Sequence, residues 1–338
     1  MLKDKVVFLS GGTGSFGKKF VEHCVKNHSD IKKLIIFSRD ELKQHEMQHQ
    51  FSDSKYPFLR YFIGDIRDKD RLVTAMEGVD IVVHAAALKH VSVAEYNPSE
   101  FIKTNILGTQ NLLDISLQNS VEKFVALSTD KASSPVNLYG ATKLCADKLV
   151  ISSNNIKGSR NSKFSVVRYG NVFGSRGSIV PLFLKQKKLG KLTVTDKSMT
   201  RFNISLQDGV KMVMWALSNS NGGEIFVPKI PSYKIMDMVS AIGGEGCAIE
   251  EIGIRPGEKI HEEMISSADS INTVELEDYF AILPPDNHNL RDFYIKEHDA
   301  RSVDIGFNYS SDINEVFLTV DDLTKILDDY NIVESNTY

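Results

Sequence analysis

Near its start the chain reads Val6-Val7-Phe8-Leu9-Ser10-Gly11-Gly12-Thr13-Gly14-Ser15-Phe16-Gly17, a short apolar run followed by spaced glycines. Gly11 permits a tight turn, Gly14 lets the backbone approach a pyrophosphate, and Gly17 allows a helix to pack closely on the strand. The N-terminus of that helix offers free N–H groups and the positive end of its dipole. In this strand–loop–helix context the segment predicts a dinucleotide-binding loop. The predicted cofactor contacts in it are Gly11, Thr13, Gly14, Ser15, Phe16 and Gly17.

Further apolar runs follow this segment and alternate with stretches of helical periodicity. The predicted strands are 6–10, 34–38, 61–66, 81–87, 124–129 and 164–172. Continuous apolar runs are typical of strands that are buried on both faces, and their alternation with helices indicates βαβ units. The pattern therefore predicts an α/β fold, a Rossmann-type doubly wound parallel sheet. We expect residues 1–173 to form the cofactor domain, joined by a later strand near 224–228, and residues 174–334 to form a smaller interleaved C-terminal α/β lobe, with 335–338 as a tail.

Composition excludes several classes of function. Hydrophobic residues make up 42% and charged residues 25% of the 338 residues, as in a globular protein. The net charge is 40 − 44 = −4, so no basic excess attracts nucleic acid or acidic lipid. The three cysteines are scattered, which favours buried thiols in a reducing compartment, and no apolar run approaches the ~18 residues of a membrane span. We therefore expect a cytoplasmic protein with no nucleic-acid or membrane partner.

Residues after the second predicted strand bear on the choice between NAD and NADP. A carboxylate there bonds the ribose 2′-hydroxyl, whereas an arginine accommodates a 2′-phosphate. Arg39 stands 39 − 17 = 22 residues after the last glycine of the loop, and Lys43 follows one helical turn later, which favours NADP. The neighbours Asp40 and Glu41 leave open the alternative that Arg39 is a surface ion-pair partner and that NAD binds. The other predicted cofactor contacts at strand ends are Ser38, Asp65, Ile66, Ala85 and Ala86.

Tyr139 and Lys143 form a Tyr-x-x-x-Lys pattern on a predicted helix. The i, i+4 spacing places both side chains on one face. A neighbouring ammonium and a nicotinamide cation would both favour tyrosinate, lowering the pKa of the phenol from about 10 toward neutrality. Tyr139 could then accept a hydroxyl proton while hydride leaves the same carbon. In contrast, His84, His90 and His261 have no metal-ligand spacing, so we expect packing or surface roles for them and no metal site.

Several short motifs of this sequence occur together in one family. They are residues 87–91, 94–98, 127–132, 137–143, 168–172, 199–202 and 255–259. Over nearly its whole length the chain resembles the extended short-chain dehydrogenases/reductases that modify nucleotide-diphosphate sugars. In that family the residues at the two positions that follow Thr129 here differ with the reaction: 4-epimerases have small residues there, and retaining 4,6-dehydratases have Asp-Glu. Asp130-Lys131 is similar to the inverting UDP-N-acetylglucosamine 4,6-dehydratases that open the pseudaminic acid pathway.

The resemblance implies a reaction and a role for each catalytic residue. Oxidation at C4 by a tightly bound, recycled NADP makes the C5 hydrogen acidic. Lys131 would then remove the C5 proton and Asp130 would protonate the departing C6 hydroxyl, beside Thr129, Tyr139 and Lys143. Hydride returns to C6, and protonation of C5 on the opposite face inverts it. Lysine acts as a base at neutral pH only if its pKa falls to about 7–8, and we expect Lys143 and the nicotinamide to supply the positive charge for this.

The resemblance also implies contacts with UDP-N-acetylglucosamine. Lys89 and Asn171 would approach the sugar and its phosphates, with Lys89 also near the cofactor, while Arg255 and Glu258 would hold the diphosphate and the ribose. Arg201 is a further phosphate candidate, and the backbone of 192–195 would pair with uracil. The full predicted set of substrate contacts is Lys89, Thr129, Asn171, Val172, Thr195, Arg201, Arg255, Gly257 and Glu258.

Two other functions remain open at this point. A UDP-sugar epimerase acting at C4 or C5 would share the cofactor site but would not need Asp130 as an acid, and water loss separates the two. A non-catalytic NADP-sensing protein could use the same fold. Family members associate through helices of the cofactor domain, so we expect a homo-oligomer, for which a hexamer has precedent. The residue that returns the C5 proton and the tolerance for UDP-glucose also stay open.

Overall fold

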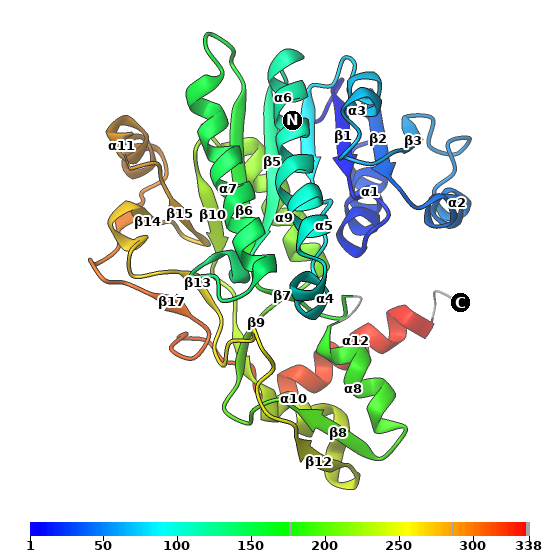
Figure 1. The fold of residues 1–338 in the computed structure, drawn as a ribbon, viewed down its shortest axis with the longest axis vertical. Helices are drawn as coiled ribbons and strands as arrows, with labels where there is room; N and C mark the ends of the chain where they lie inside the picture. The colour runs from blue at the N-terminus through cyan, green and yellow to red at the C-terminus, as the bar shows by residue number, and fades with distance from the viewer. Residues whose placement is uncertain (176–177, 286, 336–338) are drawn as a thin grey trace.

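The fold is known from a computed structural model that describes residues 1–175, 178–285 and 287–335. Within these residues a ten-stranded sheet crosses the molecule in the order β16-β14-β15-β10-β6-β5-β4-β1-β2-β3 (Figure 1). The strands from β3 to β10 in that order are parallel, whereas β15, β14 and β16 add to β10 in antiparallel fashion. The order β3-β2-β1-β4-β5-β6 is that of a Rossmann sheet, which confirms the predicted fold class.

The strands of this sheet are short; β1, β4 and β10 are fully buried, whereas the edge strand β16 is exposed. Their bounds are β1 (Val6–Ser10), β2 (Lys33–Ser38), β3 (Leu59–Ile63), β4 (Ile81–His84), β5 (Lys123–Thr129), β6 (Lys163–Tyr169), β10 (Ile225–Pro228), β14 (Thr273–Glu275), β15 (Tyr279–Ile282) and β16 (Arg301–Ser302). Strand β10 pairs in parallel with β6, so the chain returns to the sheet after passing through the lower part of the molecule. The division at residue 173 itself stays a prediction.

Helices cover both faces of the sheet. They are α1 (Ser15–Asn27), α2 (Glu41–Gln50), α3 (Lys69–Ala75), α4 (Val91–Tyr96), α5 (Pro98–Phe101), the π-helix η1 (Ile102–Leu107), α6 (Gly108–Gln118), α7 (Leu138–Ile156), α9 (Leu206–Asn219) and α11 (His288–Glu297). Side chains alternate along β1: Val7 and Leu9 belong to a core with α1 and α9, whereas Phe8 belongs to a core with α3, α6 and α7. Alternation of this kind is what a strand buried on both faces requires.

Below the carboxyl ends of the parallel strands lies a smaller α/β layer (Figure 1). Its elements are α8 (Ile179–Lys187), β8 (Lys191–Val194), α10 (Ile235–Gly243), η3 (Gly244–Gly246), β12 (Ala248–Glu251) and α12 (Val320–Ser335). These elements share a core of their own, in which Phe183, Leu192, Met238 and Leu323 are fully buried. The hydrophobic contacts of this layer therefore hold it together separately from the large sheet.

Small sheets and turns connect the two layers. They are β7 (Asn171–Val172), β9 (Thr200–Ile204) and β11 (Ser232–Lys234) in one sheet, β13 (Glu263–Ile265) with β17 (Tyr309–Ser310) in another, and the 3₁₀ turns η2 (Asp130–Ala132) and η4 (Ser270–Asn272). Strand β9 pairs with both β7 and β11. The chain thus crosses between the layers close to η2, which follows β5 directly.

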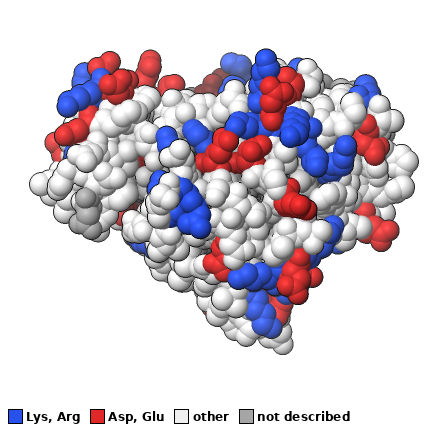
Figure 2. Space-filling model, turned by 90° about the horizontal axis from the view of Figure 1, so that it is seen from above, with Lys and Arg blue, Asp and Glu red and all other residues white. Residues whose placement is uncertain are grey.

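Four further expectations concern membrane-spanning helices, surface charge, the cysteines and the C-terminal tail. In the described residues no helix combines the length and the apolar character that crossing a membrane requires. On the face seen from above, basic and acidic side chains are interspersed rather than separated by sign (Figure 2). All three cysteines are free, but only Cys24 is buried and Cys145 is exposed, so the prediction of three buried thiols is wrong. Most of the predicted tail, 336–338, lies outside the described residues.

Candidate active site

A cleft of about 780 Å³ lies between the carboxyl ends of the parallel strands and the smaller layer. Its walls come from the glycine loop after β1, the turn after β4, η2, the start of α7 and residues of α8, β8 and the 252–262 segment. Ligands of doubly wound sheets bind at this edge, and a cleft of this volume accommodates a nucleotide-sized molecule.

The glycine loop packs closely against its neighbours and ends at the N-terminus of α1. Gly11 has φ +69°, and a Cβ atom there would lie 2.7 Å from the backbone N of Ala86. A Cβ atom on Gly17 would lie 2.3 Å from the carbonyl oxygen of Gly12, so only glycine lets α1 approach the loop this closely. The exposed Gly14 precedes α1 and no side chain caps that helix. The loop therefore fits a dinucleotide pyrophosphate at the helix N-terminus.

Most predicted cofactor residues lie around this cleft. Those that line it are Gly11, Thr13, Gly14, Ser15, Phe16, Gly17, Lys43, Ala85, Lys89, Tyr139 and Lys143. Those that do not line it are Ser38, Arg39, Asp65, Ile66 and Ala86. Arg39 is half exposed and its Nη1 atom lies 3.5 Å from Asp65, while Asp40 caps α2 by accepting from the backbone N of Lys43 at 3.0 Å. Arg39 therefore forms a surface ion pair, as expected if NAD binds. The preference for NADP over NAD stays a prediction.

Tyr139 and Lys143 lie on the first turns of α7, both buried. Lys143 Nζ donates to the carbonyl oxygen of Leu127 at 2.8 Å. Burial raises the pKa of Tyr139 to about 12, opposed by the charge of Lys131 and by a hydrogen bond with Thr129. Among the protein's own groups, the cation that lowers the phenol pKa is Lys131, and the joint effect of Lys143 and a bound nicotinamide stays a prediction.

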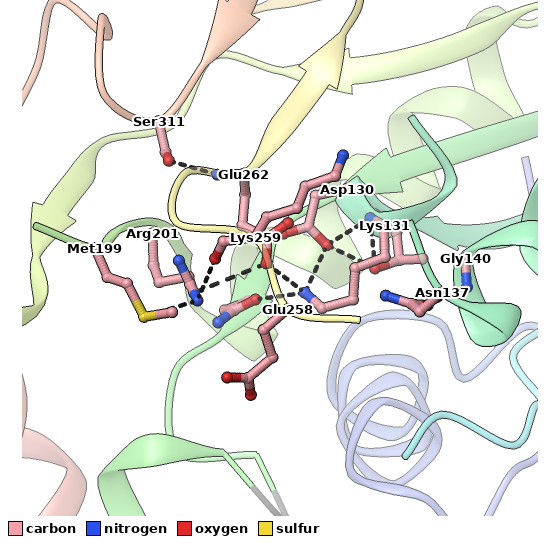
Figure 3. A network of polar contacts seen from close by, with 12 residues as sticks. Asp130, Lys131, Asn137, Gly140, Met199, Arg201, Glu258, Lys259, Glu262 and Ser311 are labelled. Carbon is pink, nitrogen blue, oxygen red and sulfur yellow. Dashed lines mark hydrogen bonds and ion pairs between the residues drawn. The ribbon is translucent and has the colours of Figure 1, made fainter. Parts of the chain in front are cut away.

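Asp130 and Lys131 form η2 immediately after β5 and stand at the centre of a polar network (Figure 3). Lys131 Nζ lies 3.2 Å from Asp130 Oδ1 and 3.5 Å from Asn171 Oδ1. A third acceptor, Glu262 Oε1, lies 3.0 Å away. Asp130 Oδ1 also accepts from the hydroxyl of Thr129 at 2.7 Å. The two residues that the sequence singled out are thus in direct contact, and Lys131 lines the cleft.

The charge environment of Lys131 differs from the expectation. Burial lowers the pKa of its ammonium, but the carboxylates of Asp130 and Glu262 outweigh burial, and the pKa is raised above its usual value. The cation that opposes them is Arg201, not Lys143. The chain's own residues therefore do not lower this pKa as predicted, because the carboxylates of Asp130 and Glu262 lie 3.2 and 3.0 Å from Lys131 Nζ.

Asp130 is 1% exposed and does not line the cleft itself. Burial raises the pKa of its carboxyl group, the charge of Lys131 opposes this, and the charge of Glu262 adds to it. The net direction is upward, as a general acid needs. Its Oδ2 atom is buried and has no hydrogen-bond partner among the described residues.

The remaining predicted substrate residues also line the cleft. Asn171, Val172, Thr195, Arg201, Arg255, Gly257 and Glu258 all line it, as do Lys89 and Thr129. Arg255 Nη2 lies 2.6 Å from Glu258 Oε1. Asn137, the N-cap of α7, accepts from the backbone N of Gly140 and donates to the carbonyl oxygen of Gly257, both at 2.7 Å. The segment 255–258 is thereby tied to the helix that carries Tyr139.

The guanidinium of Arg201 is hydrogen-bonded to backbone carbonyl oxygens of the protein itself. Its Nη1 atom donates to the carbonyl oxygens of Thr200 at 2.7 Å and Ile260 at 2.8 Å, and its Nη2 atom donates to that of Lys259 at 3.1 Å. Its Nε atom lies 3.8 Å from Glu262 Oε1. Because its N–H groups already have partners in the protein, this arrangement does not support the predicted phosphate contact.

Glu262 is the residue of this site that the sequence did not indicate. It is 2% exposed, lines the cleft and pairs with Lys131, but it belongs to no motif and follows the 255–259 segment by only three positions. Lys259, whose Nζ donates to the carbonyl oxygen of Ser133 at 2.8 Å, holds the same segment against η2. In the described residues no group of three or more His, Cys, Asp and Glu side chains could hold a metal ion.

Comparison with known proteins shows the family of this chain. A family described as polysaccharide biosynthesis protein matches residues 7–284. This chain belongs to that family. A curated relative from Campylobacter jejuni, named UDP-N-acetylglucosamine 4,6-dehydratase (inverting), is 52% identical over 97% of this chain and 98% of its own length.

The chain is also similar to a solved structure and to a second curated relative. The X-ray structure of Pen from Bacillus thuringiensis has a TM-score of 0.89 and 39% identity, covering 98% of this chain and 99% of that one. A relative from Rickettsia canadensis named UDP-glucose 4-epimerase is 44% identical over 86% of each chain. Both a dehydratase name and an epimerase name therefore occur among its relatives, the former at higher identity.

Proposed function

We propose that this protein is a UDP-N-acetylglucosamine 4,6-dehydratase that inverts C5 and yields UDP-2-acetamido-2,6-dideoxy-β-L-arabino-hex-4-ulose. The observation that carries the proposal is the 3.2 Å contact of the buried Asp130 with Lys131, which lines the cleft together with Tyr139. Elimination of water requires an acid for the leaving C6 hydroxyl and a base for the C5 proton, and an epimerase does not need Asp130 as such an acid. The name of the Campylobacter relative supports the same reaction.

A nicotinamide dinucleotide fits the glycine loop on two grounds: Gly14 is exposed to the cleft, and no side chain caps the N-terminus of α1. Lys143 and Tyr139 would lie beside its nicotinamide, and Thr13 and Ser15 beside its phosphates. Bound there, the nicotinamide would supply the acceptor for hydride from C4 and the donor of hydride to C6.

Tyr139 would accept the proton of the C4 hydroxyl as C4 is oxidised. Its hydrogen bond with Thr129 and the nearby charge of Lys131 lower its pKa against the effect of burial. The resulting ketone acidifies the C5 hydrogen, because the carbanion delocalises into it. Thr129 and Tyr139 would thus orient the sugar before elimination begins.

Lys131 would then remove the C5 proton, and Asp130 would supply the proton with which the C6 hydroxyl leaves as water. Asn171 lies 3.5 Å from Lys131 Nζ and would help to direct it toward C5. Lys89, Arg255 and Glu258 would hold the diphosphate and ribose, with Val172, Thr195 and Gly257 nearby. Arg201 is left out of this set because the protein itself occupies its guanidinium.

The finer aspects of the function are part of the proposal. Arg39 and Lys43 favour NADP over NAD. The product would enter pseudaminic acid biosynthesis in the cytoplasm, residues 1–173 would bind the cofactor and 174–334 mainly the nucleotide sugar. A homo-oligomer is supported by the exposed apolar side chains of Val93, Tyr96 and Leu107 on neighbouring helices of the cofactor layer.

The alternative function is a UDP-sugar epimerase, favoured by the name of the Rickettsia relative. Incubation of the purified protein with UDP-N-acetylglucosamine in D₂O separates the two, with products followed by mass spectrometry and proton NMR. We expect loss of one water, a new C6 methyl signal, deuterium at C5 and L-arabino couplings. A changed C4 or C5 configuration without loss of water would replace the dehydratase with the epimerase.

A further inference from the structure

Glu262 reaches the centre of the site from the segment just before β13. Its backbone is fixed by Ser311, whose Oγ atom accepts from the Glu262 N–H at 2.9 Å and whose N–H donates to the Glu262 carbonyl oxygen at 2.8 Å. Its side chain points from there to Lys131 and Arg201 (Figure 3). Its Oε2 atom is buried without a hydrogen-bond partner among the described residues. The carboxylate is therefore directed at the cations and not at solvent.

Lys131 Nζ faces as many acceptors as an ammonium has N–H bonds. Asp130 Oδ1 lies at 3.2 Å, Glu262 Oε1 at 3.0 Å and Asn171 Oδ1 at 3.5 Å. A neutral amine has only two N–H bonds and would turn its lone pair toward one of these oxygens. The surroundings thus match the protonated form, although the proposed elimination needs the amine.

We propose that Glu262 is a positioning residue that anchors Lys131 as an ammonium against Asp130 and thereby sets the pH range of the reaction. The proposal rests on the dehydratase function proposed above. Arg201 makes the anchor rigid, because its guanidinium is fixed to the carbonyl oxygens of Thr200 and Ile260 and lies 3.8 Å from Glu262. Glu262 is thus held between two cations, as a buried carboxylate must be.

One proton separates the resting pair from the reactive pair. An Nζ–H bond of Lys131 breaks and an O–H bond forms on Asp130 across their 3.2 Å contact, leaving the amine and the carboxylic acid that elimination requires. No other reactant takes part. When Lys131 then takes the C5 proton and Asp130 releases its proton to the C6 hydroxyl, the ion pair is restored. Glu262, which contacts the ammonium directly, stabilises the resting form.

All titratable groups that face Asp130 and Lys131 influence the pH dependence of the reaction. Besides Glu262 they are Arg201, Lys259, Lys89, Tyr139 and Tyr233. The charge of Glu262 raises the pKa of both Asp130 and Lys131. Because Lys131 must be unprotonated and Asp130 protonated, removal of this charge moves both limbs of the kcat–pH profile to lower pH.

The test compares Glu262→Gln, Glu262→Asp and the neighbouring control Glu263→Gln in the complete enzyme with UDP-N-acetylglucosamine. Glu263 bonds the hydroxyls of Ser133 at 3.0 Å and Ser134 at 2.8 Å and makes no ion pair with Lys131, so its variant controls for loss of a segment contact. For Glu262→Gln we expect both limbs to move down by about one pH unit or more, with a KM near that of the wild type. Glu262→Asp and Glu263→Gln should keep both limbs in place.

Unshifted limbs in Glu262→Gln, or an equal shift in Glu263→Gln, would overturn the proposal even if kcat falls. If thermal denaturation shows that Glu262→Gln does not fold, Glu262→Asp decides: a lower kcat with limbs in place supports the anchor, and displaced limbs contradict it. The wild-type enzyme distinguishes failure of the proposed function from failure of the inference about Glu262. If it releases no water from the sugar, the proposed function fails and this inference with it, whereas failure of the inference alone leaves dehydration intact.

Discussion

Arg39 stands at the end of β2 with half of its side chain exposed and its Nη1 atom 3.5 Å from Asp65. An exposed ion pair of this length contributes about 0–1 kcal/mol, so the guanidinium can exchange it for a 2′-phosphate. We predict that Arg39→Ala weakens NADP⁺ binding about 10- to 100-fold, the effect of losing charge-assisted hydrogen bonds. NAD⁺ binding should change less than about threefold. Titration calorimetry with both dinucleotides measures the difference, and equal losses for the two would show that Arg39 does not meet a 2′-phosphate.

Residues adjacent in the chain were predictable at the site, and residues that meet across the fold were not. The pairs Asp130-Lys131 and Tyr139–Lys143 lie within a few positions of each other, so a motif contains them. Glu262 contacts Lys131 across 262 − 131 = 131 positions, which no local pattern records. The same limit applies to the pKa of Lys131, since the direction of its shift depends on which charges the fold brings near.

Element bounds show where local pattern and tertiary structure differ. The run 81–87 predicts one strand, but β4 ends at His84: the Ala85 N–H still donates to the Ser10 carbonyl oxygen at 3.2 Å, whereas the Ala86 N–H donates to the Ser10 hydroxyl at 3.3 Å. The run 164–172 divides at Gly170 into β6 and β7, and β7 pairs with β9 instead of extending the main sheet. Hydrophobicity predicted the strands, whereas side-chain contacts at the cleft set their ends.

Helix α7 carries Tyr139 and packs against η2 at Gly140. A Cβ atom on Gly140 would lie 2.1 Å from the carbonyl oxygen of Lys131. We predict that Gly140→Ala displaces η2, lowers kcat at least about tenfold and costs about 1–3 kcal/mol of stability, as overpacking does. In the control Gly209→Ala on α9 the nearest atom would be 3.8 Å away, in Tyr169, so up to about 1 kcal/mol of stabilisation is expected. Urea unfolding and steady-state kinetics of both variants check this, and similar behaviour of the two would refute it.

His84 ties three elements together. Its Nδ1 atom lies 2.7 Å from the Ser10 hydroxyl of β1, and its Nε2 atom lies 2.9 Å from that of Thr109 in α6. Burial, with a contribution from the charge of Lys143, lowers the pKa of His84 to about 3. The unfolded chain titrates near 6.5 and binds more protons below that pH, so stability falls as pH decreases from about 6.5 toward 3.

Between pH 7 and pH 5 this single group should cost about 2 kcal/mol of unfolding free energy. We predict that His84→Gln is less stable than the wild type at pH 7 but loses about 2 kcal/mol less on going to pH 5. Urea unfolding of both proteins at the two pH values provides the comparison. Parallel losses in the two proteins would mean that His84 is not held neutral in the folded state.

At the scale of the whole molecule, Asn137 links the two walls of the cleft. It caps α7 through Gly140 and donates to the carbonyl oxygen of Gly257, both at 2.7 Å. Aspartate keeps the cap but cannot donate, so we predict that Asn137→Asp raises KM for the UDP-sugar about 2- to 10-fold with little change in stability. Asn137→Ala should also lose about 1 kcal/mol of stability because the cap is gone. If Asn137→Asp leaves KM unchanged, the 255–258 segment does not position the substrate.

The central claim about this enzyme is that Lys131 acts in the elimination of water and not in the oxidation at C4. The most direct measurement is mass spectrometry of the sugar nucleotide after Lys131→Met, checked for folding by circular dichroism, is mixed with UDP-N-acetylglucosamine at equal concentration. Because Tyr139 and Lys143 are intact, the account predicts a 4-keto sugar that has lost two hydrogens and kept its C6 hydroxyl. Formation of the 4-keto-6-deoxy product at the wild-type rate would contradict it.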